Sequence, residues 1–445
     1  MRIITLLALM NGWLWAQFGP RHIIDNSITG ITDITLADIN DDGYPDIITA
    51  QKYHLDCICY YLNLGNGTFD SPQILIPIQN PSTLIAADFN NDGKIDIATA
   101  SNNLQTSDSI YLLIHQNSTH FTTHIIDTQI WNVQKIITAD INNDNYPDLI
   151  TIADTALYIY HNNGNTTFSK MRVPPPIPTE YYDLTTSDID NDGWIDIIVG
   201  SVQTQIYKNT NGIFYYDSAR SQSIANVGLV LLVELADYDN DGDPDLLING
   251  NHQSDMRWYP NNGNGIFAPP QIIQTNTAQC AASSSKDIDQ DGDIDILAIF
   301  PQTGKVVWYE NIENASFSNE KIIHIGNPPF PTTVQTADLT GNGKHDLIWA
   351  EELSVHFNTT TSSIPTSNPS QTFTVQPHPA SPHGFTIKSN INGTLSIYNV
   401  MGQPMVTHVP IQKGHNLIPL SLPPQTYVLV VNTTSLTIRK KLLIR

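Results

Sequence analysis

A nine-residue segment rich in aspartate and asparagine recurs seven times in this chain of 445 residues, at intervals of 48 to 52 residues. The copies read DINDDGYPD, DFNNDGKID, DINNDNYPD, DIDNDGWID, DYDNDGDPD, DIDQDGDID and DLTGNGKHD, and they begin at Asp38, Asp88, Asp140, Asp188, Asp237, Asp287 and Asp338. A repeat of this period is one supersecondary unit that buries its apolar face only against its neighbours. The repeat therefore constrains the fold more than the length, which alone suggests about three domains.

Short apolar runs flank every copy of the segment. One run precedes it, a run of aliphatic residues follows it, and a third run carries an aromatic residue near its end. A phenylalanine then introduces a fourth run, and these residues are Phe18, Phe69, Phe121, Phe168, Phe214, Phe267 and Phe317. Short β-branched and aliphatic runs between turn residues predict strands, so we expect four antiparallel strands in each repeat.

The two ends of the repeat region are out of phase. Residues 18–25, FGPRHIID, match the fourth strand of a repeat, whereas only three strands follow the seventh segment. The N-terminal strand therefore completes the last sheet, and closure of the ring removes the exposed sheet edges. This pattern predicts an all-β fold, a seven-bladed β-propeller over residues 17–358. An open array of sandwiches is the alternative.

The repeated segment carries side-chain oxygens at positions 1, 3, 5 and 9, and Gly or Asn at position 6. Three or four carboxylates within nine residues repel one another unless a cation lies between them, and calcium takes six to eight oxygen ligands. A residue with positive φ at position 6 lets the chain turn around the ion, and the backbone carbonyl of position 7 can then join the ligands. An EF-hand is excluded because position 12, which is Thr49 in the first copy, lies in a predicted strand and is never Glu.

We therefore expect up to seven calcium ions, one in each loop between the first and second strands of a blade. Ion-free Asp-Gly hairpin turns are the alternative. The seventh loop is the weakest candidate because Thr340 and Asn342 replace acids. The candidate ligands are Asp38, Asn40, Asp42, Tyr44, Asp46; Asp88, Asn90, Asp92, Lys94, Asp96; Asp140, Asn142, Asp144, Tyr146, Asp148; Asp188, Asp190, Asp192, Trp194, Asp196; Asp237, Asp239, Asp241, Asp243, Asp245; Asp287, Asp289, Asp291, Asp293, Asp295; and Asp338, Thr340, Asn342, Lys344, Asp346.

With these motifs, the chain from about Phe18 to Phe357 resembles the FG-GAP or VCBS repeat family, whose calcium-loop propellers are also seen in integrin α-subunits. The resemblance implies that the calcium loops are structural and that partners bind on the opposite face of the propeller. A glycan or protein ligand is therefore expected on that face.

The last 93 residues contain no Asp or Glu, which sets them apart from the acidic repeats. Residues 359–371 form a Ser/Thr/Pro linker, and the alternating apolar sequence of residues 372–445 predicts a small β-sandwich. The blocks TVQPHPASPHGFTI, LSIYNVMGQ, TYVLVV and KKLLIR resemble the C-terminal sorting domain of the type IX secretion pathway, although His378 and Gln425 depart from that family's pattern. The resemblance implies export through that machinery and removal of the tail. A retained binding module is the alternative.

Residues 1–16, MRIITLLALMNGWLWA, have the basic start, apolar run and small final residue of a signal peptide. We expect a secreted or outer-membrane-surface protein without a transmembrane segment. Cys57, Cys59 and Cys280 are an odd set, and Cys57 and Cys59 share one strand face, so we expect small core residues and no disulfide framework.

The net charge of −23 argues against a nucleic-acid partner, because phosphates would be repelled. No HExxH, G-x-S-x-G or P-loop motif is present. The main hypothesis is therefore a binding or adhesion module. The alternatives are a calcium-dependent carbohydrate-active enzyme and a purely structural subunit of a surface complex.

Aromatic residues in the links between blades could bind sugar rings or a protein, or could fold back onto the rim. These candidates are Trp131, Tyr181, Tyr182, Tyr215, Tyr216 and Phe330. Links between the second and third strands, residues 52–56, 102–108 and 251–255, would share that face. Trp258 and Trp308, in third strands, are expected to be packing residues.

Overall fold

The computed structural model describes residues 18–358 and 373–443, with gaps at 29, 53–54, 104–106, 118, 177–178, 225–228, 251–254, 276–278, 313–314, 327–332, 351, 382–383, 390–392, 400–403, 419–425 and 433–436. The chain divides into two compact units, Met1–Thr360 and Thr361–Arg445. The predicted signal peptide and the predicted linker lie outside the described residues.

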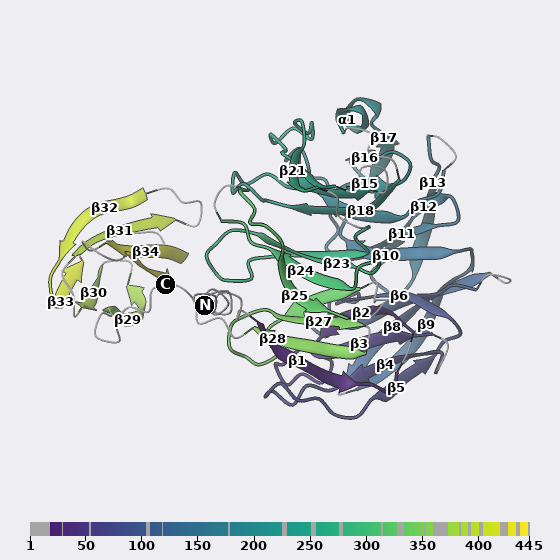
Figure 1. Ribbon diagram of the computed structural model, residues 1–445, viewed down its shortest axis with the longest axis horizontal. Coiled ribbons are helices and arrows are strands. Elements are labelled where there is room, and N and C mark those ends of the chain that lie inside the picture. The colour runs from purple at the N-terminus through teal and green to yellow at the C-terminus, as the bar shows by residue number, and fades with distance from the viewer. Residues whose placement is uncertain are drawn as a thin grey trace, which may run out of the picture. The chain divides into compact units, whose positions relative to one another are not determined.

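The described part of the first unit contains seven four-stranded antiparallel sheets, and Figure 1 shows them following one another in chain order. Six are consecutive: β2 (Ile31–Ala37), β3 (Asp46–Gln51), β4 (Cys57–Tyr61), β5 (Gln73–Pro77); β6 (Pro81–Ala87), β7 (Asp96–Ser101), β8 (Asp108–Asn117), β9 (His120–Ile130); β10 (Val133–Ala139), β11 (Asp148–Ala153), β12 (Ala156–Asn162), β13 (Phe168–Val173); β14 (Asp183–Ser187), β15 (Asp196–Gly200), β16 (Gln205–Thr210), β17 (Ile213–Tyr216); β18 (Val230–Ala236), β19 (Asp245–Gly250), β20 (Met256–Tyr259), β21 (Gln271–Gln274); and β22 (Ala282–Lys286), β23 (Asp295–Phe300), β24 (Lys305–Tyr309), β25 (Lys321–Ile325). The short helix α1 (Ser218–Ser223), which the sequence did not predict, follows β17.

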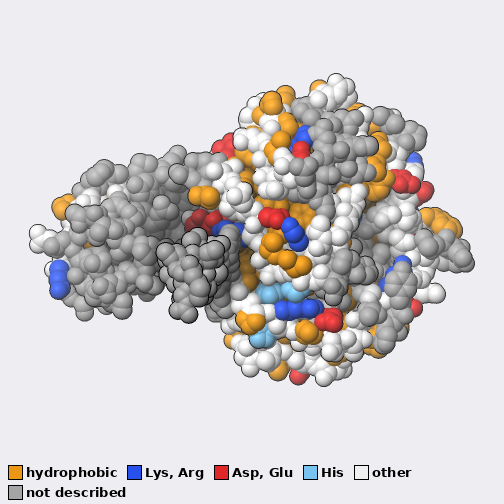
Figure 2. Space-filling model, in the orientation of Figure 1, with side chains coloured by type: hydrophobic (Ala, Val, Ile, Leu, Met, Phe, Trp, Pro, Cys, Tyr) orange, Lys and Arg blue, Asp and Glu red, His pale blue; other side chains and the backbone are white. Residues whose placement is uncertain are grey.

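The remaining sheet joins the two ends of the repeat region. Its order is β1 (Phe18–Asp25), β28 (Leu353–Asn358), β27 (Asp346–Ala350), β26 (Val334–Ala337), which confirms that the N-terminal strand pairs with the last strands of the repeats. His356 Nδ1 donates to the Gly19 carbonyl at 2.7 Å, and Arg21 Nη2 lies 3.0 Å from Glu352 Oε2. Figure 2 shows histidine and basic side chains gathered on this face of the unit.

The core of the first unit lies between neighbouring sheets. The second strand of every sheet is buried along its length, which explains its continuous aliphatic run. One apolar cluster packs Ile34 and Ile47 of the first sheet against Ile348 and Leu353 of the last. The same kind of packing therefore joins the last sheet to the first. Trp258 and Trp308 are buried, as expected of packing residues.

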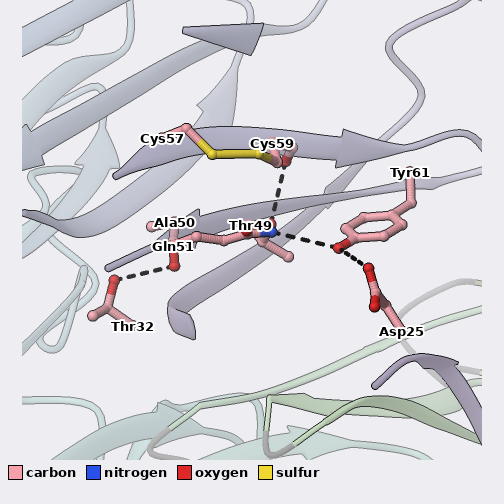
Figure 3. The surroundings of a disulfide bond; sticks show 8 residues. All are labelled: Asp25, Thr32, Thr49, Ala50, Gln51, Cys57, Cys59 and Tyr61. Carbon is pink, nitrogen blue, oxygen red and sulfur yellow. Dashed lines mark hydrogen bonds between the residues drawn. A yellow bond between two sulfur atoms is a disulfide. The ribbon is translucent and has the colours of Figure 1, made fainter. Parts of the chain in front are cut away.

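Cys57 and Cys59 form a disulfide within β4, so the expectation of two unpaired core cysteines was wrong (Figure 3). Both side chains are buried, as predicted, but their shared strand face favours the bond. Residues i and i+2 point to the same side of a strand, and their Cα atoms lie 5.9 Å apart, within the range that disulfides span. Cys280 is free and buried.

The second unit contains two antiparallel sheets in its described residues. One has the order β29 (Phe373–Ser381), β30 (Gly384–Ser389), β33 (Gly414–Ile418), and the other β32 (Pro404–Ile411), β31 (Gly393–Asn399), β34 (Thr426–Asn432), β35 (Thr437–Leu443). These strands agree with the alternating blocks of the sequence. Across the described residues of both units, no helix has the length and apolarity needed to cross a membrane.

Candidate functional site

The aspartate segments all connect the first and second strands of a sheet, at the ends of the innermost strands. In the first sheet, β2 ends at Ala37 and Asp38 opens the loop, while Asp46 closes it as the first residue of β3. Ala37 and Asp46 are paired across the hairpin. The other six segments occupy the same place in their sheets.

Within each loop the side chain of the first aspartate accepts backbone hydrogen bonds that stabilise the turn. Asp38 accepts the backbone N–H groups of Asp42 at 3.1 Å and Gly43 at 2.7 Å, and Asp42 accepts that of Tyr44 at 2.9 Å. Position 6 has a positive φ in all seven loops, as predicted, and Asn145 adopts it at 69°. Position 4, which was not among the predicted positions, also has a positive φ in every loop. The sequence pattern that indicates this backbone conformation is that position 4 is always Asp, Asn, Gln or Gly.

The aspartates at position 9 are fully buried in all seven loops. Asp46 accepts the Ile39 N–H at 3.0 Å with Oδ2 and the Asn63 N–H at 2.7 Å with Oδ1. Burial nevertheless raises the pKa of Asp46 to about 6 and that of Asp295 to about 8, and carboxylates within the same loops add to the rise. The buried charge is therefore only partly compensated by hydrogen bonds.

A recurring asparagine at the end of the third strand connects each sheet to the preceding one. Asn63 Nδ2 donates to the Leu339 carbonyl at 2.9 Å, which links the first sheet to the loop of the last. The equivalent donors are Asn162, Asn209, Asn261, Asn311 and Asn358, whereas His115 occupies this place in the second sheet. We missed these residues because asparagine after an aromatic run resembles an ordinary turn signal.

Several loops bring their predicted ligands together. Ligand atoms lie within 4.8 Å of one another in the groups Asp188, Asp190, Asp196; Asp237, Asp239, Asp245; and Asp287, Asp289, Asp291. Two buried oxygens of the loops have no hydrogen-bond donor, Asp287 Oδ1 in the sixth loop and Thr340 Oγ1 in the seventh. Such orphaned acceptors fit a cation in these loops, because buried oxygens without a partner are costly. Asp243 and Asp293 instead accept side-chain amides from the preceding loops, Asn191 and Asn240.

The fourth loop differs from the others because a lysine from the third strand of its sheet contacts its carboxylates. Lys208 Nζ lies 2.6 Å from Asp190 Oδ1, 2.7 Å from Asp192 Oδ2 and 3.4 Å from Asp196 Oδ1. The Lys208 side chain is only 5% exposed. Arg220, on α1, binds the other oxygen of Asp190 at 2.7 Å.

A polar cavity of about 290 Å³ lies at the opposite ends of the innermost strands. Its lining comes from all seven sheets and includes Asp33, Lys135, Asp183, Ser283 and Gln335. These residues stand at or near the starts of their strands, whereas the aspartate loops follow the strand ends. A seven-residue strand such as β2 separates the two sites by roughly 20 Å.

Side chains around this cavity also join neighbouring sheets. Asp33 Oδ2 accepts the Leu84 N–H at 2.9 Å, and Asp183 Oδ2 accepts the Val233 N–H at 2.8 Å. Each N–H belongs to the innermost strand of the next sheet, whose edge would otherwise lack an acceptor there. Asp183 also forms an ion pair with Lys135. The acids of the cavity therefore have structural partners as well as accessible surface.

Some of the candidate aromatic residues are exposed, as expected of binding residues, and others are buried, as expected of packing residues. Trp131 and Tyr215 are half exposed, whereas Tyr181 is buried and within hydrogen-bonding distance of Tyr207. Tyr182 lines the cavity. Tyr215 and Tyr216 lie in the outer strand β17, so their predicted place in a link between sheets was wrong.

The other predicted contact points lie wholly or partly outside the described residues. These are Phe330 and, within the three links, residues 53–54, 104–106 and 251–254.

Comparison with known proteins identifies the repeats and the fold. The family model described as FG-GAP-like repeat matches residues 38–99, 88–151, 140–199, 237–298 and 287–349, which together span more than half of the chain. No curated protein matches the chain significantly.

Two solved structures illustrate the fold. One is an Agrocybe aegerita lectin that recognises non-reducing terminal N-acetylglucosamine, with 18% identity, a TM-score of 0.52, and coverage of 76% of this chain and 87% of the lectin chain. The other is BBS1N in complex with ARL6DN, with 12% identity, a TM-score of 0.54, and coverage of 78% of this chain and 99% of the other. At these identities the likeness extends to the fold alone.

Proposed function

The chain belongs to the FG-GAP-like repeat family, and we propose that it is a seven-bladed, calcium-stabilised β-propeller that binds a glycan or a protein at the face opposite its aspartate loops. Each four-stranded sheet is one blade, and the pairing of β1 with β28 closes the ring. The apolar cluster shared by the last and first sheets supports this closure.

The observation that carries the binding proposal is the polar cavity at the starts of the innermost strands. Its lining offers hydroxyl, amide, carboxylate and ammonium groups from Ser283, Gln335, Asp33 and Lys135, together with the aromatic ring of Tyr182. This mixture of hydrogen-bonding groups and an aromatic ring suits a sugar. The volume is near the lower end of the range for small-ligand pockets, which suits one or two sugar rings. A lectin among the structural neighbours supports the same class of ligand.

A glycan array combined with a polysaccharide depolymerisation assay on the full chain tests this proposal. Gln134 is an exposed residue of the cavity lining, so Gln134→Trp should obstruct the mouth and abolish binding. Ile125→Trp adds the same side chain at an exposed position on the outer strand β9 and should leave binding unchanged. Binding without turnover would support the proposal, and glycan turnover would favour the enzyme hypothesis. Neither binding nor turnover would favour a structural subunit.

Calcium is proposed for the aspartate loops because their position-9 carboxylates are buried, and because ligand atoms in several loops lie close together and are incompletely paired. Burial raises the pKa of Asp295, at position 9 of the sixth loop, to about 8, and Asp287 Oδ1 and Thr340 Oγ1 lack hydrogen-bond donors. A bound divalent cation would supply the missing charge and complete the coordination of these oxygens. Removal of calcium by a chelator should lower Tm strongly, and added calcium should restore it. A Tm that is independent of calcium would contradict the proposal.

The export proposal follows from the ends of the sequence. We propose that residues 1–16 direct secretion, and that residues 372–445 form a β-sandwich that engages the type IX machinery and is then removed, leaving a released or surface-attached propeller. Mass spectrometry of the exported protein tests this, because a product that retains the chain to Arg445 would contradict removal of the tail.

A further inference from the structure

The fourth aspartate loop has the full set of carboxylates at positions 1, 3, 5 and 9, which are Asp188, Asp190, Asp192 and Asp196. By sequence it is therefore one of the strongest calcium candidates. Its geometry differs from that expectation, because Lys208 Nζ contacts the carboxylates of three of these four residues at 2.6 to 3.4 Å.

Lys208 reaches the loop from β16, the third strand of the same sheet. It immediately precedes Asn209, the third-strand asparagine that contacts both the buried Asp196 and the preceding blade. The residues that precede the equivalent third-strand position in the other blades are Leu62, Ile114, His161, Pro260, Glu310 and Phe357. Lys208 is the only lysine or arginine among the seven residues. The ammonium in the loop is therefore a feature of this blade and not of the repeat.

A second cation adds to the positive charge at the loop. Arg220 Nη2 lies 2.7 Å from Asp190 Oδ2, so each oxygen of Asp190 contacts a different cation. Arg220 also binds Asp217, the residue that caps α1, and the Asn264 carbonyl of the next blade. The helix inserted between β17 and β18 thus delivers a second positive charge to the loop.

We propose that Lys208 and Arg220 replace calcium in the fourth loop, so that this loop is stable without a metal and the propeller holds at most six calcium ions. The inference rests on the proposed calcium binding of the other loops. Calcium needs oxygen ligands at 2.3–2.6 Å, and the Lys208 ammonium already lies at 2.6 Å and 2.7 Å from two of the oxygens it would use. Calcium could enter only if this buried ammonium left its three carboxylate partners.

Hydrogen exchange of the full wild-type chain tests the proposal directly. Protection of a peptide covering residues 187–197 should be the same with calcium and with chelator. Protection of a peptide covering residues 286–296, from the sixth loop, should fall on chelation. Equal loss of protection in both peptides would overturn this inference while calcium binding stands. If the protection of neither peptide depends on calcium, both the calcium proposal and the proposed difference between the two loops are contradicted.

Native mass spectrometry of Lys208→Met provides a second test. The variant keeps the length of the side chain and removes its charge, so it should bind one more calcium ion than the wild type, with an upper limit of seven. Lys170→Met is the matched control, because Lys170 pairs with Asp127 away from the loops, and its calcium count should not change. Seven ions on the wild type, or equal counts for wild type and Lys208→Met, would overturn the proposal.

Discussion

The fourth and sixth loops carry the same four acidic positions but differ in the residue that faces them from the third strand. In the fourth blade this residue is Lys208, whose ammonium contacts three loop carboxylates. In the sixth sheet it is Glu310, whose carboxyl group interacts with that of Asp289. Burial first, and then Asp291 and Glu310, raise the pKa of Asp289 to about 7. The fourth loop therefore contacts a lysine from its own sheet, whereas the sixth faces a further carboxylate, Glu310, which is itself paired with Lys321.

We infer from this difference that the aspartate segment alone does not determine the proposed metal dependence. The deciding side chain lies 12 residues beyond the fourth loop and 15 beyond the sixth, counted from position 9. A repeat can thus keep its fold while a single third-strand substitution changes how its loop is neutralised.

Exchanging the charges of the two third-strand residues should exchange the behaviour of the two loops. Lys208→Glu replaces the only ammonium of the fourth loop with a fifth carboxylate, and breaking a buried ion pair typically costs about 3–5 kcal/mol. We expect Tm in chelator to fall by roughly 10 °C, with recovery in calcium. Glu310→Lys should make the sixth loop insensitive to chelator. Differential scanning calorimetry with and without calcium measures both effects.

A variant at the equivalent position of another sheet shows whether the effect of the lysine depends on its particular strand. Leu62→Lys tests whether an ammonium at this place is sufficient to make a loop independent of calcium. Leu62 lies at the corresponding position of the first blade. If Lys208→Glu lowers Tm equally with and without calcium, the lysine has only a packing role.

Arg220 contributes the second positive charge to the fourth loop, so its removal should have a smaller effect. Arg220→Met leaves Asp190 and Asp217 each with one partner fewer, and hydrogen bonds to charged groups are worth about 1.5–3 kcal/mol. We expect the free energy of unfolding to fall by about 1.5 kcal/mol, the lower end of this range, because Lys208 remains in contact with Asp190. Chemical denaturation measures it, and Arg257→Met, which removes a pair with Asp255 outside the loop, is the control. Recovery of the Arg220→Met loss by calcium would show that the arginine also excludes the metal.

The sequence predicted the repeat, the strands, the pairing of the N-terminal strand with the last sheet and the oxygen spacing of the loops. These features depend on local periodicity, which a single chain displays directly. The contact of Lys208 could not be predicted, because a lysine near the end of a strand normally points to solvent and this contact depends on the hairpin geometry. The cysteine pair was mispredicted for a local reason, since a shared strand face was taken to oppose the disulfide that it permits.

The acid sensitivity of the closing sheet must be separated from that of the loops, because acid also releases calcium from carboxylates. His356 is buried against Trp349, and burial lowers its pKa to about 4, with His324, Arg21 and His22 acting in the same direction. The unfolded chain binds this proton near pH 6.5 and the folded chain only near pH 4. Stability is therefore lost as the pH falls from about 6.5 to about 4.

His356→Gln should remove this part of the acid sensitivity. We expect the variant to lose about 2 kcal/mol less stability than the wild type between pH 7.5 and pH 5, in urea denaturation at saturating calcium. His120→Gln, at an exposed position on β9, should behave as the wild type does. Identical pH profiles for His356→Gln and the wild type would show that the loops alone account for acid sensitivity.

The smallest predicted effects act on the calcium affinity of the sixth loop, in opposite directions. Glu310 Oε2 lies 2.5 Å from Lys321 Nζ, so the carboxylate is shared between the loop and this lysine. Glu310→Gln removes a negative charge from the loop and should weaken calcium binding about tenfold, or about 1.4 kcal/mol. Lys321→Met removes the competing cation and should strengthen binding by a few fold. Hydrogen exchange of residues 286–296 against calcium concentration measures both, while residues 187–197 serve as the internal control. Shifts of both variants in the same direction would mean that Glu310 affects the loop by packing and not by its charge.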